Sequence, residues 1–254
     1  MTYSNQQLIN FFSWFGEMAA FMTQYMRASL SPPFEMREMV RQMQEVGIRS
    51  LPLVIVAGAA IGTVLTLHSQ DTLTRLGAEA LIPTLIVFSM IQESGPLITA
   101  LVVAGRVGAG IGAELGSMKV TDQIDALEVS GVDTIHYLVV TRITALALTL
   151  PILTLCADAA GIISGYLLTG FTMERFLNLG FELIRFQDFF PNTFRTIIFG
   201  LIIGVVSCYQ GLTVRGGTAG VGRAATRSVV YSTLFLILSD VVTVKLVYLI
   251  FGRL

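Results

Sequence analysis

Acidic side chains stand inside apolar sequence at several points of the chain, and Glu93 has the most unusual surroundings. It ends a long apolar run and is followed by Gly95 and Pro96, in the segment MIQESGPLITALVVAGR. A carboxylate in a bilayer is costly, so such residues usually face a cavity or a partner. Because Pro96 lacks a backbone donor, we expect a discontinuous helix there, with a polar spot beside a cavity. A structural glutamic acid bonded to a neighbouring carbonyl is the alternative.

Three other charged residues, Asp158, Asp240 and Lys245, also lie in apolar runs. Asp240 and Lys245 are five positions apart, so on one helix their head groups could meet only with bent side chains. Two interpretations stay open for these residues. They could make structural contacts between helices, or they could serve an ion-coupled secondary carrier.

The sequence gives less support for a catalytic role than for these. Ser94 and Ser164 each precede a glycine, a pattern seen in intramembrane serine proteases, but the histidines, His68 and His136, are expected at opposite membrane faces. The sequence has no cluster of cysteine and histidine for a metal and no GxxxxGK[ST] loop for nucleotide phosphates. We therefore expect no catalytic residue, metal or cofactor in this chain; an intramembrane hydrolase is a further alternative.

The composition shows what must carry these residues. The 254 residues are 54% hydrophobic and 13% charged, with a mean hydropathy of +0.74, whereas soluble domains carry about 25% charged residues. The apolar runs are long and continuous, which predicts an all-α integral membrane protein rather than a barrel of alternating strands. A formal net charge of -1 gives no reason to expect nucleic acid as a partner.

We expect one domain (1–254) with five transmembrane helices in 50–254, preceded by amphipathic helices in 1–49. The first of these, 5–27, would lie in the membrane interface. The spans are expected near 50–67, 81–104, 137–169, 193–209 and 228–251, with a short amphipathic helix in the loop 170–192. The distribution of basic residues favours a cytoplasmic N-terminus and a C-terminus on the other side.

A polar, acidic segment, KVTDQIDALEVSGVD, follows the second span and the glycine-rich AGRVGAGIGAELGSM. We expect the glycines to form a flexible turn where the span leaves the membrane. Thr121 as N-cap and Gly131 as stop predict a short cytoplasmic helix within 117–131 that exposes Asp122, Asp125 and Glu128. The helix could be a solvated linker or a docking element for a cytosolic partner.

Small residues four positions apart allow helix backbones to approach closely in lipid. They could serve packing within the chain or a homodimer interface. The pairs are Gly58/Gly62, Gly161/Gly165 and Gly200/Gly204.

Taken as a whole, the central segment resembles the signature region of the MlaE-type permeases. The likeness is carried by the series E-x-G-P, AGR-x-G, AE-x-G-x-M and T-x-Q-I-x-AL-E, and continues in GGTAGVGRAATRSVV before the last span. The resemblance implies the permease subunit of an ABC-type lipid transporter in the bacterial inner membrane, with the C-terminus in the periplasm. It also implies a homodimer, two cytosolic ATPase subunits that bind ATP and Mg, an Mce-domain periplasmic partner and a phospholipid substrate.

The resemblance assigns roles to individual residues. Glu93 matches the family's acid near the lipid pocket, Gly95 and Pro96 match its helix break, and Gln92 stands where many relatives carry a basic residue. The residues that fall in the region that docks on the ATPase are Glu114, Asp122, Gln123, Asp125 and Glu128.

The resulting hypothesis places a lipid headgroup near Gln92, Glu93 and Ser94. Acyl chains would lie against apolar walls from the first, second and fifth spans, and the ATPase would push on helix 120–130, which the glycine-rich segment joins to the second span. The predicted wall residues are Val54, Ile61, Leu65, Leu97, Leu101 and Leu234. The alternative remains the ion-coupled carrier that uses Asp158, Asp240 and Lys245.

Overall fold

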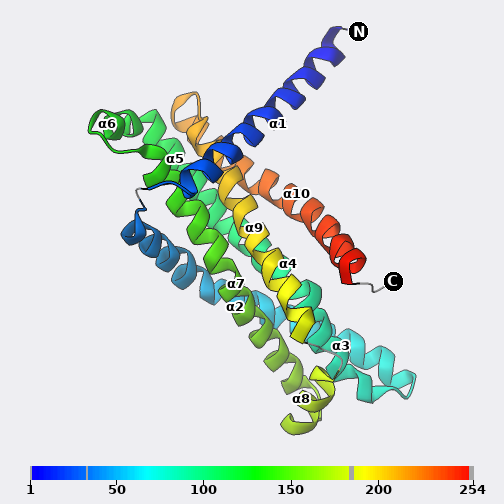
Figure 1. Cartoon of the computed structure of the whole chain (residues 1–254). Helices are drawn as coiled ribbons and strands as arrows, with labels where there is room; N and C mark the ends of the chain where they lie inside the picture. The colour runs from blue at the N-terminus through cyan, green and yellow to red at the C-terminus, as the bar shows by residue number, and fades with distance from the viewer. Residues whose placement is uncertain (1, 33, 183–185, 252–254) are drawn as a thin grey trace.

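The computed structural model describes residues 2–32, 34–182 and 186–251, and every regular element in these ranges is helical (Figure 1). Five helical stretches are long and apolar enough to cross a membrane, as predicted. Their bounds are Met36–Arg75, Glu79–Val120, Ile135–Leu168, Pro191–Leu212 and Gly217–Leu246. The chain is therefore an all-α multi-pass membrane protein.

The first long helix after the N-terminal segment differs from the prediction. Helix α2 runs without interruption over Met36–Arg75, with Pro52 inside it. The second of the amphipathic helices expected within 1–49 and the expected span 50–67 are thus one rod, because the helical pattern continues across the boundary at Ser50. Ser50 itself is fully buried and accepts a hydrogen bond from Arg106 at 2.7 Å.

The second span continues well past its predicted end at residue 104. It consists of η1 (Glu79–Leu81), α3 (Ile82–Ser89), η2 (Met90–Ser94), α4 (Gly95–Val103), η3 (Ala104–Gly108) and α5 (Ala109–Val120). The predicted break at Gly95-Pro96 is wrong: η2 is one wider, π-helical turn, and Pro96 lies in the first turn of α4. One unbroken rod therefore joins the membrane interior to residue 120.

The predicted flexible turn in the glycine-rich segment is also wrong, for a packing reason. A Cβ atom on Gly108 would lie 3.0 Å from the Ser207 hydroxyl, and one on Gly116 would lie 2.9 Å from Val214. These glycines allow close approach of α9 (Phe186–Leu212) and α10 (Gly217–Phe251) to the rod. Their small size serves helix packing rather than a turn.

The centre of the bundle is α7 (Thr141–Leu168), which extends from the π-helical η4 (Ile135–Val140). A Cβ on Gly58 or Gly62 of α2 would collide with the backbone of Ala157 or Gly161 on α7. On another side of α7, a Cβ atom on Gly200 of α9 would lie 2.7 Å from the Cα atom of Ala147. The three glycine pairs thus pack helices of the same chain, as one of the two interpretations predicted.

Helix α1 (Thr2–Ser29) lies against the bundle with its C-terminal half and extends away from it toward the N-terminus (Figure 1). The Tyr209 hydroxyl donates to Glu17 at 2.7 Å, and the rings of Phe21 and Tyr209 meet edge to face, 5.9 Å apart. Tyr25 is within hydrogen-bond distance of Thr144, at 3.3 Å. These contacts attach α1 to α9 and α7.

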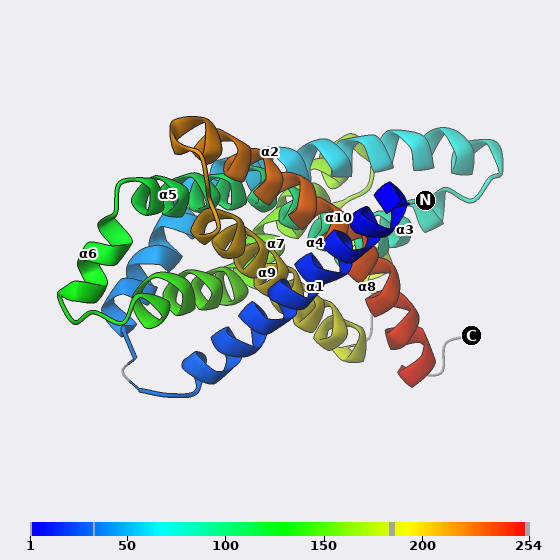
Figure 2. The ribbon, with the colours of Figure 1, turned by 90° about the horizontal axis from the view of Figure 1, so that it is seen from above.

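The two ends of the bundle carry different elements (Figures 1 and 2). Helix α6 (Gln123–Val129) lies at one end, far from the turn that joins α2 to the second span. Helix α8 (Met173–Phe181), the helix predicted in the loop 170–192, packs on α3 near that turn. Its Phe176 is fully buried, whereas Leu177 and Phe181 are exposed.

Candidate functional site

A buried arginine brings together polar groups from three spans. The Arg195 side chain on α9 is only 3% exposed, and its Nη1 lies 3.3 Å from Asp240 Oδ1 on α10 and 3.8 Å from Glu93 Oε2 on η2. Its Nη2 donates to the carbonyl oxygen of Gln92 at 2.5 Å. We call Glu93, Arg195 and Asp240 the charged cluster.

The local sequence explains why this carbonyl is available. In an α-helix the N–H of residue 96 would donate to the carbonyl of Gln92, but proline has no N–H. The freed carbonyl is partly buried, where an unpaired polar group is costly, and Arg195 satisfies it. Asn192, one turn before Arg195, donates to Gln92 Oε1 at 3.2 Å. Pro96 thus creates the acceptor that ties α9 to the second span.

The three charges of the cluster differ in their exposure. The Asp240 side chain is 9% exposed, whereas Glu93 is 52% exposed. Arg195 and Asp240 therefore form a buried pair, and Glu93 presents a carboxylate at the accessible edge of that pair. A positive group beside Glu93 was expected to be missing because residue 92 is glutamine; Arg195 supplies it from a different helix.

An apolar groove of about 650 Å³ has residues close to the charged cluster in sequence, although none of the three charged side chains lines it. Ile198 of the groove lies one helical turn after Arg195, and Ser239 immediately precedes Asp240. Helices α1, α9 and α10 form its walls. The lining residues are Met18, Ala19, Met22, Ile198, Leu201, Ile202, Val205, Val206, Phe235, Leu238, Ser239 and Val242. Its volume falls within the range of about 300–1,000 Å³ typical of ligand sites.

A second apolar groove of about 530 Å³ lies between α2 and α7. Small side chains form much of its lining. The residues are Ile55, Ala59, Cys156, Ala159, Ala160, Ile163, Ser164 and Leu167. The Ser164 hydroxyl lies within hydrogen-bond distance of the Ala59 and Gly161 carbonyl oxygens, at 2.8 and 2.9 Å, and the contact with Ala59 joins α7 to α2.

The residues predicted as acyl-chain walls occupy other positions. Val54 is completely buried in the core, and Leu234 on α10 is exposed. None of the six lines either apolar groove; the other four, Ile61, Leu65, Leu97 and Leu101, are half-buried. Their role in lipid binding stays a prediction. Ser94 is likewise half-buried, at the end of η2.

Helix α6 presents acids outward, as predicted. Ile124 is the buried residue of this helix, while Asp122, Gln123, Asp125 and Glu128 are exposed. Thr121 is not the N-cap, because its hydroxyl donates back to Ser117 at 2.9 Å. That position belongs to Asp122, whose backbone is left-handed with φ 55°.

Polar contacts attach α6 to the helices on both sides of it. Lys119 at the end of α5 donates to Asp125 at 2.9 Å, and the Thr134 hydroxyl before η4 donates to Glu128 at 2.9 Å. Gly131, with φ 81°, ends the segment as predicted, since only glycine adopts that region readily. A force on α6 would therefore reach both α5 and α7.

Glu114, predicted to help dock the ATPase, has a partner within the chain. Its Oε1 accepts a hydrogen bond from Nη2 of Arg142 at 2.8 Å. Arg142 is 4% exposed, whereas Glu114 is 54% exposed. This ion pair joins α5 to α7, and the exposed part of Glu114 leaves its docking role a prediction.

Beside α6, His136 links the loop before η4 to the end of α1. Its ring Nδ1 donates to Asp133 Oδ2 at 2.7 Å, and Nε2 lies 3.2 Å from the Ser31 carbonyl oxygen. Partial burial raises the pKa of Asp133, but hydrogen bonds from the N–H and ring of His136 and from the N–H of Ile135 outweigh it. The pKa of Asp133 is therefore held below its usual range.

The residues predicted for an ion-coupled carrier do not come together in one site. Asp240 pairs with Arg195 and not with Lys245, which is exposed. Asp158 on α7 is 7% exposed and packs against Gly95. No group of three or more metal-ligating side chains occurs within residues 2–32, 34–182 and 186–251.

Arg195 is the residue that sequence reasoning missed. It lies inside the span predicted for 193–209, near its start, and no partner was predicted for its charge. A basic residue inside a span is as costly as an acidic one and needs a partner. That rule, applied to Arg195 as it was to Glu93, would have indicated an ion pair.

Comparison with known proteins gives the family of the chain. The family model described as Permease MlaE matches residues 39–246. A probable ABC transporter permease protein of Rickettsia typhi is 37% identical over 223 residues, which are 86% of each chain. Another from Synechocystis is 36% identical over 208 residues, 80% of this chain and 79% of the relative.

A plant protein is also similar to the chain. The chloroplastic protein TRIGALACTOSYLDIACYLGLYCEROL 1 of Arabidopsis thaliana is 34% identical over 210 residues, 81% of this chain and 60% of its own length. The match to the family model covers most of the chain, including the charged cluster and α6. The chain therefore belongs to the MlaE permease family and is a membrane-spanning subunit of an ABC transporter.

Proposed function

We propose that this permease moves phospholipids or related lipids between the bacterial inner membrane and an Mce-type periplasmic partner. The observation that carries the proposal is that the charged cluster and the apolar groove between α1, α9 and α10 share helices α9 and α10, where Ile198 follows Arg195 by one turn and Ser239 precedes Asp240. A lipid has a polar end and an apolar end, and these two helices carry a polar and an apolar environment. The groove walls contribute almost no polar surface.

In this proposal the headgroup lies at the accessible edge of the cluster, beside Glu93 and Gln92. Arg195 is held by Asp240 and the Gln92 carbonyl, so its position is fixed before a lipid arrives. Fixed donors and acceptors lower the ordering cost of binding. The acyl chains extend along Ile198 and Ile202 toward Phe235.

The relatives support a lipid substrate in one respect. The name of the Arabidopsis relative contains that of a galactolipid, trigalactosyldiacylglycerol. A lipid of that kind has a large polar headgroup and two acyl chains. The same division into a polar and an apolar environment would serve it.

The energy source is the ATPase partner that an ABC permease requires. We infer that two ATPase subunits bind ATP and Mg and dock on the exposed acids of α6 in a complex built on a permease homodimer. Lys119–Asp125 and Thr134–Glu128 would carry the resulting movement into α5 and α7. This places α6 and the N-terminus in the cytoplasm and the C-terminus in the periplasm.

A reconstituted transport assay tests the proposal. The permease, its ATPase and its Mce partner are placed in vesicles, and ATP-dependent transfer of a fluorescent phospholipid is measured. Glu93→Gln should reduce transfer by about tenfold or more, the scale of losing one hydrogen bond to a charged group. Glu45→Gln is the matched control, because Glu45 is 44% exposed but lies on α2, in an ion pair with Arg49.

Two results would contradict the proposal. Undiminished transfer by Glu93→Gln would remove the headgroup role. Transfer that continues without ATP and stops when an ion gradient is collapsed would instead favour the ion-coupled carrier.

A further inference from the structure

One ion pair connects the two helices that lie on either side of α6 in the chain. Glu114 on α5 accepts a hydrogen bond from Nη2 of Arg142 on α7 at 2.8 Å, and Arg142 is 4% exposed. The Nη1 of the same guanidinium donates to the carbonyl oxygen of Leu138 at 3.0 Å, inside the π-helical η4. One buried arginine thus holds a carboxylate of α5 and the backbone that leads into α7. We call the Glu114–Arg142 ion pair the brace.

The brace closes a ring of contacts that includes α6. From α5, Lys119 donates to Asp125 of α6, and from the segment before η4, Thr134 donates to Glu128 of α6. The brace joins α5 to α7 at a point six residues before the end of α5, which is about 9 Å along the helix. Two contacts at α6 and one across the brace therefore form a triangle, and a triangle of contacts resists shear between its sides.

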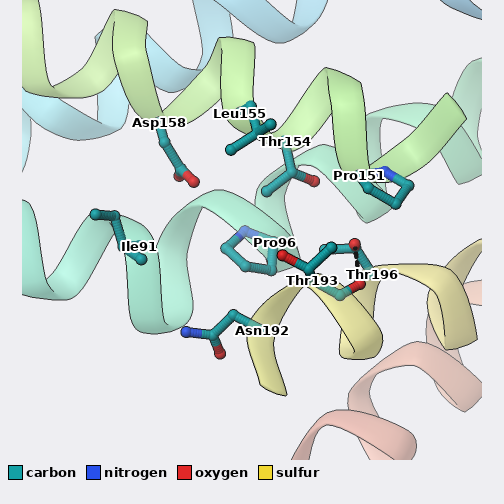
Figure 3. Close-up of a pocket in the computed structure, with 9 residues that line it drawn as sticks. All are labelled: Ile91, Pro96, Pro151, Thr154, Leu155, Asp158, Asn192, Thr193 and Thr196. Atoms are coloured by element: carbon teal, nitrogen blue, oxygen red, sulfur yellow. Dashed lines mark hydrogen bonds between the residues drawn. The ribbon is translucent and has the colours of Figure 1, made fainter. Parts of the chain in front are cut away.

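Helix packing does not hold α5 and α7 together directly. Helix α5 packs on α9 and α10, whereas α7 packs mainly on α2 and α9. Farther from α6, α7 meets α4, and Figure 3 shows Thr154 and Asp158 of α7 directed toward α4 around Pro96. Packed helices can slide past one another by small shear movements. In the part of the chain that the structure describes, the brace is the polar contact that joins α5 directly to α7.

We propose that Arg142 is a positioning residue for transport. It locks Glu114, and with it α5, to α7, so that a movement imparted to α6 reaches both helices as one body. The inference rests on the proposed function in taking α6 as the element on which the ATPase acts, and it assigns Glu114 to Arg142 rather than to the ATPase surface. A guanidinium suits this task, because its donors lie in one plane and can hold a carboxylate and a carbonyl at once.

The unequal burial of the two partners determines which substitution tests the brace. Arg142 is buried, whereas Glu114 is 54% exposed. Loss of Arg142 leaves a carboxylate that water can solvate, but loss of Glu114 leaves a buried and unpaired cation, which is costly. Arg142→Met is therefore the variant that breaks the brace with the smaller effect on folding.

The coupling of ATP hydrolysis to lipid transfer tests the proposal on the complete complex in vesicles. In Arg142→Met the lipid transferred per ATP hydrolysed should fall by about fivefold, within the range for substitutions between coupled sites, while the ATPase still co-purifies. A loss of folded permease alone would lower hydrolysis and transfer together and leave this ratio unchanged. Arg49→Met is the matched control, because Arg49 pairs with Glu45 on the exposed surface of α2. An unchanged ratio in Arg142→Met would overturn the proposal.

A double variant separates the two possible roles of Glu114. If Glu114 acts only through Arg142, adding Glu114→Gln to Arg142→Met leaves the ratio of the single variant unchanged and retains the ATPase. A further fall in the ratio, or loss of the ATPase on co-purification, would show that Glu114 works independently of Arg142. Either result would overturn the assignment of Glu114 to the brace.

A distance measurement on the same complex needs no lipid transfer and so tests the brace apart from the proposed substrate. Spin labels are attached through Gly110→Cys on α5, where a Cβ has nothing within 4 Å, and Leu148→Cys on α7, which is 45% exposed. The native Cys156 and Cys208 are replaced by alanine, and one protomer of each complex carries the labels.

ATP binding should leave the distance between the labels unchanged when Arg142 is present and should change it in Arg142→Met. A change on ATP binding in both chains, or in neither, would contradict the brace. If the distances behave as expected but the complex with Arg142 transfers no lipid, the proposed substrate is wrong and the brace stands.

Discussion

Arg195 on α9 and Asp240 on α10 form an ion pair inside the bundle, with 3.3 Å between Nη1 and Oδ1. A buried pair of this kind adds little net stability compared with apolar residues of similar volume. Removing one partner, however, leaves the other charge buried and unpaired. The same guanidinium holds the Gln92 carbonyl, so one side chain connects the second, fourth and fifth spans. The stability of the site therefore depends on Arg195 more than on any acid beside it.

Arg195→Met should destabilise the permease by about 3–5 kcal/mol, because Asp240 is left buried and unpaired. Reversible unfolding in mixed micelles measures this. The double variant Arg195→Met/Asp240→Leu should recover most of the loss, since no charge then remains unpaired in the buried pair.

The exposed pair Arg75–Asp71 provides the comparison. Its side chains are 77% and 67% exposed, and surface pairs contribute about 0–1 kcal/mol. Arg75→Met should therefore change little. If Arg195→Met costs no more than Arg75→Met, the charged cluster has no structural role.

Gly95→Ala should destabilise the contact between the second span and α7. The added Cβ would collide with the Asp158 carboxylate and lie 2.9 Å from the Met90 carbonyl oxygen. Overpacking of this kind costs about 1–3 kcal/mol. Unfolding midpoints measure the effect, and Asp158→Ala in the same chain should relieve part of it by removing the carboxylate.

Gly105→Ala is the control on the same rod, because nothing lies within 4 Å of a Cβ at that position. Alanine also has the higher helix propensity, by about 1 kcal/mol. Gly105→Ala should be neutral or stabilising. Equal losses from both substitutions would indicate a general sensitivity of the rod rather than a contact at Gly95.

Charge reversal on α6 should release the ATPase. Asp122→Lys/Glu128→Lys places two positive charges on the surface that is predicted to dock, and co-purification of the ATPase with the permease measures the loss. Because Glu128 also accepts from Thr134, Thr134→Val serves as the control that removes this bond without changing charge. Retention of the ATPase by the double reversal would refute docking on these acids.

The sequence predicted the number of spans, the short helix with its outward acids and the family. Each depends on local patterns: continuous apolar runs, the stripe that buries Ile124, and the motif around Glu93. The continuity of the second span was predicted less well. A glycine or a proline breaks a helix only when no neighbouring helix supplies the missing contact or hydrogen bond. Pro96 and the glycines of 105–116 lie inside one rod, since Arg195 satisfies the Gln92 carbonyl and α9 and α10 pack on the glycines.

The charged cluster could not be derived from local sequence in the same way. Glu93, Arg195 and Asp240 are far apart in the chain, and the choice of Arg195 rather than Lys245 as the partner of Asp240 depends on how α9 and α10 pack. Lys245 is close to Asp240 in sequence but exposed. Tertiary packing, which the spacing does not encode, decides the pairing.

The Asp133–His136 contact should make stability depend on acid pH. The pKa of Asp133 is lower in the folded chain than its unfolded value of about 3.9. Its contribution is therefore present above the unfolded pKa and is lost as the pH falls through the folded pKa. Unfolding midpoints measured below about pH 5 should fall less steeply in Asp133→Asn than in the wild type. Identical slopes would contradict the contact.

The central claim is that a lipid binds in the groove between α1, α9 and α10. A substitution that fills this groove tests the claim most directly. Ala19 lines the groove on α1, whereas its neighbour Ala20 does not. We predict that Ala19→Trp lowers both the phospholipid that co-purifies with the permease, counted by native mass spectrometry, and ATP-dependent lipid transfer. Ala20→Trp should leave both unchanged. Equal lipid occupancy and transfer in the two variants would contradict a lipid site between α1, α9 and α10.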